Sequence, residues 1–186
     1  MTTEKLELSY PPHLFVVRHE KESNLRNKRL DNVHALADSI AKRYEGLERH
    51  IYLLTSHEFR AVATGKILAD DLGINVNSEI DRYVALCGSE ESGIGLKDVD
   101  QSLKERSQNS NGLVLVGHLP FMREYLPFIM KEEMGIDVTF ESDTFVEKDY
   151  QNRFFAKRDG KKEIFWMPAE ASGYYFDLSK KQYESI

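Results

Sequence analysis

The seven residues Leu14-Phe15-Val16-Val17-Arg18-His19-Glu20 constrain the fold of this chain more than any other segment. Four apolar residues stand together without polar alternation, which is typical of a strand buried on both faces of a parallel sheet. A cation, an imidazole and a carboxylate follow at once. Open α/β sheets bind their ligands beyond the carboxyl ends of their strands. The segment therefore predicts a strand over 13–18 that carries Arg18 and His19 to a ligand site.

Two further apolar runs, 51–54 and 113–116, predict strands of the same kind. Helical spacing and stop signals predict helices from about 31 to 46, over 59–72, over 96–108, and over 121–134 with an interruption or kink at Pro127. The charged run 20–29 and the glycine-containing run 87–95 are interpreted as loops. Alternation of strands and helices predicts an α/β fold, a three-layer α/β/α sandwich around a mainly parallel sheet.

The pattern changes after residue 134, where aromatic residues are spread among charges. Asp159-Gly160 is a good hairpin turn between two apolar stretches, so we expect a β-hairpin insertion near 136–166. A final strand is expected over 172–178. Because no repeat or linker is visible, the chain is interpreted as a single domain over 1–186.

Composition excludes several classes of protein. The 186 residues have a net charge of -6, with acids and bases interspersed, which argues against nucleic-acid binding. The single cysteine, Cys87, excludes an intrachain disulfide and paired-cysteine metal sites, and is expected to be inert. No signal peptide or membrane-spanning run is evident, so a cytoplasmic monomer without membrane contact is expected.

The carboxyl ends of the three buried strands carry Arg18 and His19, then Ser56 with Arg60 one turn on, and finally His118. Parallel strands bring these ends to one edge of the sheet. Arginine presents a planar fork of donors that matches phosphate oxygens, and a helix N-terminus with Ser56 as its candidate N-cap would add backbone N–H donors. A neutral imidazole is a nucleophile toward phosphorus. The set therefore indicates a phosphoryl group as ligand.

These residues resemble the motifs of the histidine phosphatase superfamily, which has the phosphoglycerate mutase-like fold. The first motif, a strand and then Arg-His-Gly, matches 16–19, with Glu20 in place of the glycine. The second, Ser-x-x-x-Arg-Ala-x-x-Thr, matches 56–64, and the third matches 113–120. The small size, the short segment between the second and third motifs, and the run Val114 to Pro120 resemble the SixA-type phosphohistidine phosphatases.

The resemblance implies a two-step transfer in which His19 is phosphorylated and then hydrolysed. Arg18, Arg60 and His118 would hold the phosphoryl oxygens, with neither metal nor cofactor, and Ser56 and Glu20 would lie at the substrate. Weak evidence for a general acid, for which Glu79, Asp81, Glu90 and Glu91 are candidates, favours phosphohistidine as substrate. The partner would be a phosphorylated protein or a small phosphorylated molecule.

Two alternatives stay open. One is a small-molecule phosphomonoesterase or a mutase. The other is a non-catalytic phosphate-binding module, with Glu20 disabling the site and the 136–166 insertion serving as the contact surface. His57 is interpreted as part of a solvated loop.

Overall fold

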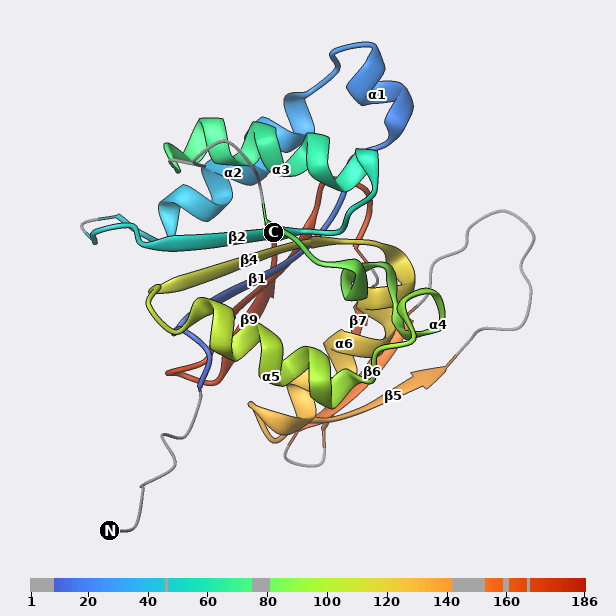
Figure 1. The fold of residues 1–186 in the computed structure, drawn as a ribbon. Coiled ribbons are helices and arrows are strands. Elements are labelled where there is room, and N and C mark those ends of the chain that lie inside the picture. The colour runs from blue at the N-terminus through green and yellow to red at the C-terminus, as the bar shows by residue number, and fades with distance from the viewer. Residues whose placement is uncertain (1–8, 46, 75–80, 142–152, 159–160, 167) are drawn as a thin grey trace, which may run out of the picture.

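The computed structural model describes residues 9–45, 47–74, 81–141, 153–158, 161–166 and 168–186. Its main sheet has six strands in the order β3-β2-β4-β1-β8-β9. The strands are β1 His13–Arg18, β2 Ile51–Thr55, β3 Asp81–Arg82, β4 Gly112–Gly117, β8 Gly173–Asp177 and β9 Gln182–Ser185. The first four in that order run parallel, whereas β8 is antiparallel to β1, and β9 to β8 (Figure 1).

Helices cover both faces of this sheet, so the predicted three-layer α/β/α architecture is confirmed. Helices α2 Asp31–Lys42 and α3 Phe59–Leu72 lie on one face, and α5 Leu96–Ser107 and α6 Leu119–Glu132 lie on the other (Figure 1). Strand β1 divides its side chains between two apolar cores. Phe15 and Val17 pack under α2 and α3, whereas Leu14 and Val16 pack in the core with α5 and α6. All four are fully buried, as a strand without polar alternation requires.

Several local predictions differ from the structure. A short helix, α1 Glu22–Arg26, lies in the expected loop 20–29, and its first and last residues form an i,i+4 ion pair. The 3₁₀ turn η1 Val84–Cys87 and the short helix α4 Ser89–Ser92 account for much of the expected loop 87–95. Helix α2 ends at Lys42, before the expected stop near 46.

Helix α6 continues through Pro127 and is not interrupted there. A proline inside a helix removes one backbone hydrogen bond and strains the preceding turn. Here the helix buries Tyr125 and Leu126 before the proline and Ile129 and Met130 after it. This packing on both sides of Pro127 holds the helix in one piece.

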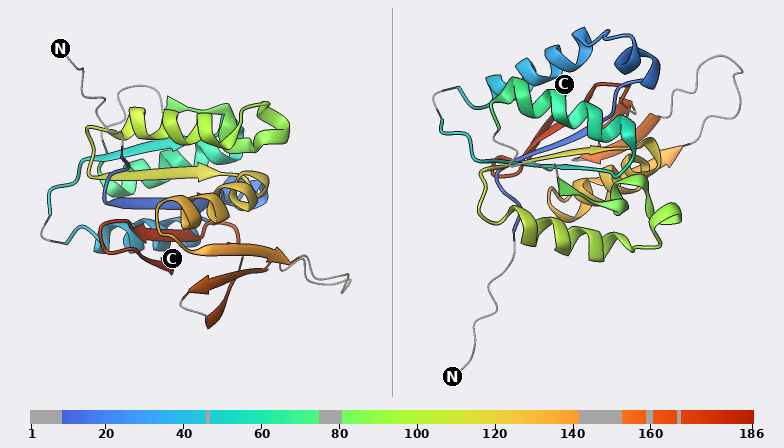
Figure 2. Two further views of the ribbon diagram at one scale, coloured as in Figure 1. Left: turned by 90° about the horizontal axis from the view of Figure 1, so that it is seen from below. Right: turned by 45° about the horizontal axis from the view of Figure 1, so that its top comes forward.

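The insertion near 136–166 contains the expected hairpin, to which a further strand is added to form a three-stranded antiparallel sheet. It consists of β5 Asp137–Glu141, β6 Arg153–Arg158 and β7 Lys161–Trp166, and it follows α6 directly (Figure 2). The expected turn at 159–160 lies outside the described residues. Strand β9 was missed, because a polar edge strand lacks an apolar run. Among the helices of the described residues, none has the length and apolarity to cross a membrane.

Candidate active site

The carboxyl ends of β1, β2 and β4 lie at the same level of the sheet. Arg18 pairs with Gly117 in the parallel register of β1 and β4, and Thr55 pairs with Val116 in that of β2 and β4. Two backbone bonds extend this alignment past the strand ends, from His19 N to Gly117 O at 3.2 Å and from Ser56 N to Val116 O at 3.0 Å. The three segments that carry the predicted site residues therefore leave the sheet side by side.

The structure brings His19 and His118 together in the space above these strand ends. Their ring centroids are 4.5 Å apart with the planes inclined by 58°. Only 4% of His19 and 7% of His118 are exposed. Gly117, directly before His118, has no room for a side chain, since a Cβ there would lie 2.8 Å from the Phe121 ring and 3.0 Å from the Leu86 carbonyl oxygen.

The hydrogen bond of His19 fixes its tautomer. Its Nδ1 lies 2.8 Å from the backbone carbonyl oxygen of Glu20. A carbonyl oxygen only accepts, so Nδ1 must carry the proton, and in the neutral ring the lone pair is on Nε2. His19 is thus oriented as a nucleophile or base through Nε2.

Burial and nearby cations keep both imidazoles neutral. The pKa of His19 is lowered, first by burial and then by the charges of Arg60 and Arg18, although the Glu20 carbonyl and Glu170 act in the opposite direction. The pKa of His118 is lowered to about 3, mainly by burial and also by His19 and Arg60. A neutral His19 is the form with an available lone pair.

His118 is held by Ser56. The Ser56 hydroxyl lies 2.6 Å from His118 Nε2, and both side chains are buried. Ser56 does not cap the following helix as the sequence predicted. The N-cap of α3 is Glu58, without a side-chain cap bond, and Ser56 Oγ accepts a hydrogen bond from Glu58 N at 3.3 Å. The N-cap is therefore Glu58, two residues after the predicted one, whereas the predicted helix over 59–72 is confirmed.

The two arginines have different surroundings. Arg18 donates to the Pro168 carbonyl oxygen at 3.2 Å and pairs with Glu170 Oε1 at 3.2 Å, and its buried Nε has no hydrogen-bond partner among the described residues. Arg60 is half-buried in the first turn of α3, and no described carboxylate forms an ion pair with it. Its positive charge acts on both imidazoles. The site therefore contains one partly compensated cation and one uncompensated cation.

Glu20 enters the site through its backbone carbonyl rather than its carboxylate. The side chain is 1% exposed, and its Oε1 accepts from Lys21 N at 2.7 Å and from Asn24 Nδ2 at 3.0 Å. Its backbone N donates to Thr64 Oγ1 at 3.0 Å, and Thr64 Oγ1 donates in turn to the Arg60 carbonyl oxygen at 2.8 Å. These contacts direct the carboxylate into α1 and fasten the loop after β1 to α3.

The structure describes the side chains of two of the four candidates for a general acid. Glu79 lies outside the described residues. Asp81 belongs to β3 by its backbone, but its side chain is likewise outside the description. Glu90 and Glu91 are exposed in α4. Sequence reasoning missed Glu170, whose charge acts on His19 and which pairs with Arg18; its position just before β8 was the only available signal.

A hollow of about 380 Å³ adjoins the Ser56–Arg60 segment. It is lined by His57, Phe59, Val62, Ala63, Lys66 and Arg82. Phe59 is 59% exposed, and the Arg26 guanidinium lies 5.8 Å from its ring centroid. This surface offers an aromatic face together with cationic groups beside His57.

The fold and the site define an α/β protein with two histidines and two arginines at the carboxyl edge of a mainly parallel sheet. Among solved structures, the chain is similar to a protein assigned as phosphohistidine phosphatase SixA from Agrobacterium tumefaciens, with a TM-score of 0.46 and 15% identity over 87% of this chain and 100% of that chain. It is also similar to a phosphoglycerate mutase from Plasmodium falciparum, with a TM-score of 0.44 and 9% identity over 88% of this chain and 92% of that one. No family model matches the sequence, and no curated protein matches it either.

Proposed function

We propose that this protein is a phosphatase that forms a covalent phosphohistidine on His19 and acts on phosphohistidine in a protein, as the SixA-type enzymes do. One observation carries the proposal. The Glu20 carbonyl holds the proton of His19 on Nδ1, so that Nε2 presents its lone pair beside His118 and near two arginines. This is the arrangement that in-line attack on phosphorus requires.

In the first step, the lone pair of His19 Nε2 attacks phosphorus. A P–N bond forms and the bond to the leaving group breaks, with its electron pair going to the leaving group. Arg60, Arg18 and His118 bind the equatorial oxygens, where charge is held in the transition state. An oxygen bound there also supplies the acceptor that the buried Arg18 Nε lacks among the described residues.

In the second step, water attacks the phosphoryl group on His19. The P–N bond breaks, inorganic phosphate leaves, and the proton of the water passes to solvent. Burial keeps the pKa of His19 low, so the ring returns to its neutral form and is ready for another cycle. The scheme assigns no step to a metal or cofactor.

The choice of phosphohistidine rests on the leaving group. An imidazole leaving group can be protonated on its own ring nitrogen, whereas an alkoxide needs a proton from an enzyme acid. Glu90 and Glu91, the acid candidates whose side chains the structure describes, are exposed in α4. We infer that the exposed Phe59 ring, in the hollow that it shares with His57, offers a stacking face for the leaving imidazole.

The test is a quenched-flow experiment with ³²P-labelled phosphohistidine peptide. We expect label on the protein that is stable in alkali and lost in acid, and that maps to His19. The variant His19→Ala should show neither label nor turnover, and the exposed His50→Asn should behave as the unchanged protein. Absence of label, together with unchanged turnover in His19→Ala, would refute the proposal.

A substrate panel separates the alternatives. Turnover of sugar phosphates or nucleotides above that of phosphohistidine peptide would favour a small-molecule phosphomonoesterase, and a requirement for a bisphosphate primer would favour a mutase. Phosphate binding in the calorimeter without turnover of any panel member would favour a non-catalytic binding module.

A further inference from the structure

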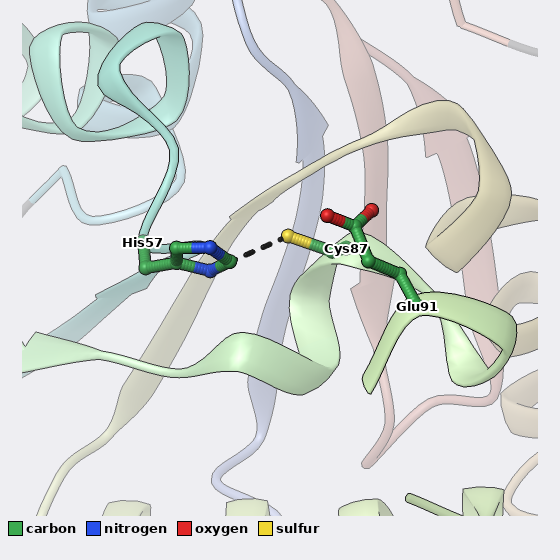
Figure 3. A group of neighbouring side chains, drawn as sticks. All are labelled: His57, Cys87 and Glu91. Carbon is green, nitrogen blue, oxygen red and sulfur yellow. Dashed lines mark hydrogen bonds between the residues drawn. The ribbon is translucent and has the colours of Figure 1, made fainter. Parts of the chain in front are cut away.

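Three residues that the scheme above leaves without a role bring metal-ligating atoms together beside the site. His57 follows β2, Cys87 ends η1, and Glu91 lies in α4 (Figure 3). One ligand atom from each lies within 4.8 Å of the other two. These are a ring nitrogen, a sulfur and a carboxylate oxygen, which are the three kinds of protein ligand that zinc uses.

The spacing of two of these atoms is that of a coordination sphere. His57 Nδ1 and Cys87 Sγ are 3.6 Å apart (Figure 3). A tetrahedral zinc ion with bonds of about 2.0–2.1 Å to nitrogen and about 2.3 Å to sulfur separates those two ligands by about 3.5 Å. An ion can therefore fit between the two atoms with little movement of either side chain.

The other nitrogen of His57 faces a carboxylate. His57 Nε2 lies 3.5 Å from Glu58 Oε1. Metal-binding histidines commonly donate their second N–H to a carboxylate, which fixes the tautomer and strengthens the ligand. With the proton on Nε2, the lone pair of His57 is on Nδ1, the atom that faces Cys87.

We propose that His57 Nδ1, Cys87 Sγ and a carboxylate oxygen of Glu91 bind one divalent ion of the zinc class, with water as the fourth ligand. Sulfur and imidazole ligands select such an ion over magnesium or calcium, which prefer oxygen. Cys87 is 1% exposed, but His57 and Glu91 are exposed, so an ion reaches the sulfur from the solvent side.

Binding releases one proton. The thiolate is the form of cysteine that binds metal. When the ion binds, the S–H bond breaks, a sulfur–metal bond forms and the proton passes to the buffer.

Cobalt(II) is the probe, because its spectrum reports the ligands. Cys87 is the only cysteine in the chain, so any thiolate-to-cobalt charge-transfer band must come from it. We expect one ion per chain, tetrahedral d–d bands, a charge-transfer band, and displacement of cobalt by zinc. Cys87→Ser should lose the charge-transfer band, and His57→Gln and Glu91→Gln should each weaken binding at least about tenfold.

Matched controls come from the same surface. Glu90→Gln changes the neighbouring exposed carboxylate of α4, and His50→Gln changes a histidine whose Nε2 pairs with Glu48 at 3.2 Å. Neither should change cobalt affinity by more than about twofold. If Cys87→Ser does not fold, the exposed variants His57→Gln and Glu91→Gln decide the question. The proposal is overturned by a cobalt complex without the charge-transfer band, by one ion per two chains, or by equal effects of Glu90→Gln and Glu91→Gln.

Discussion

Strand β1 carries a histidine at each end, and the two ends differ in instructive ways. His13 is the first residue of the strand, and His19 follows its last residue. Burial is the largest cause of a lowered pKa in both. His13 Nδ1 lies 2.8 Å from the Tyr175 hydroxyl and borders a hollow of about 670 Å³, which is larger than the hollow beside Arg60. His19 is buried and His13 only partly so, but the larger hollow lies at the His13 end, so the size of a hollow does not identify the candidate site.

Charge does separate the two ends of β1. At the His13 end, Arg43 pairs with Glu184 at 2.6 Å and Lys180 pairs with Asp177 at 2.8 Å. At the His19 end, Arg18 pairs with Glu170, but Arg60 has no ion pair with a described carboxylate. At the His19 end, Arg60 therefore offers an anion a positive charge that no described carboxylate compensates. That end also presents the imidazole whose nucleophilic nitrogen is fixed.

The largest expected difference is between the histidines themselves. His19→Ala should lower kcat at least about a thousandfold, because the nucleophile is removed. His13→Gln should leave kcat within about twofold. Steady-state rates on phosphohistidine peptide check both, with melting curves to show that each variant is folded. Equal losses in the two variants would mean that the fold, and not the chemistry of one end, sets the rate.

Replacing an arginine should also lower kcat more at the His19 end than at the His13 end, but by less than replacing the histidine. Arg60→Ala should lower kcat about 10²- to 10³-fold, the cost of losing one donor to transition-state charge. Arg43→Ala, at the opposite end, should not change it. Arg60→Lys should recover only part of the loss, because an ammonium lacks the planar fork. Full activity in Arg60→Ala would remove Arg60 from the mechanism.

A third difference should appear in how the free energy of unfolding depends on pH. The unfolded chain has histidines of pKa about 6.5, whereas the pKa of folded His118 is about 3. Between these values the unfolded state binds more protons, so the stabilisation is complete above pH 6.5 and is lost as the pH falls. The slope from this one residue is about 1.4 kcal/mol per pH unit. Urea unfolding at several pH values should show that the free energy of unfolding depends less on pH in His118→Asn than in the unchanged protein. His13→Asn should reduce this dependence less, and a slope unchanged in His118→Asn would contradict the assignment.

The fold at the His19 end of β1 could be predicted because each strand there has a recognisable local sequence pattern. Four consecutive apolar residues mark β1, and the polar residue after each strand marks the edge that α/β sheets use for ligands. The meeting of His19 and His118 followed from parallel topology alone, across about a hundred residues of chain. Strand β9 could not be found this way, because its exposed side chains carry no apolar signal.

The side-chain contacts were beyond the reach of sequence reasoning. Nothing in the segment Arg18 to Glu20 says that the Glu20 carboxylate points toward Asn24 and its carbonyl toward His19. Arg18 and Glu170 are far apart in the chain, as are His57 and Cys87. These contacts depend on how loops fold over the strand ends, and so does the position of Glu91. Periodicity and motif spacing carry no information about such contacts.

Replacing Glu170 should have the smallest effect of these changes. It tests selectively whether the charges at the His19 end govern anion binding. The carboxylate of Glu170 pairs with Arg18 at 3.2 Å and with Lys21 at 3.8 Å, so it partly neutralises the cations that an anion would use. Glu170→Gln should therefore tighten the binding of phosphate or tungstate about two- to fivefold, the scale of a partly exposed ion pair. Calorimetry at low and high salt measures this, and the gain should shrink as salt screens the charge. Glu184→Gln removes the matching carboxylate from Arg43 at the opposite end and should leave anion affinity unchanged. If both variants bind phosphate more tightly to the same extent, the net charge of the protein, rather than the local field at the His19 end, governs anion binding.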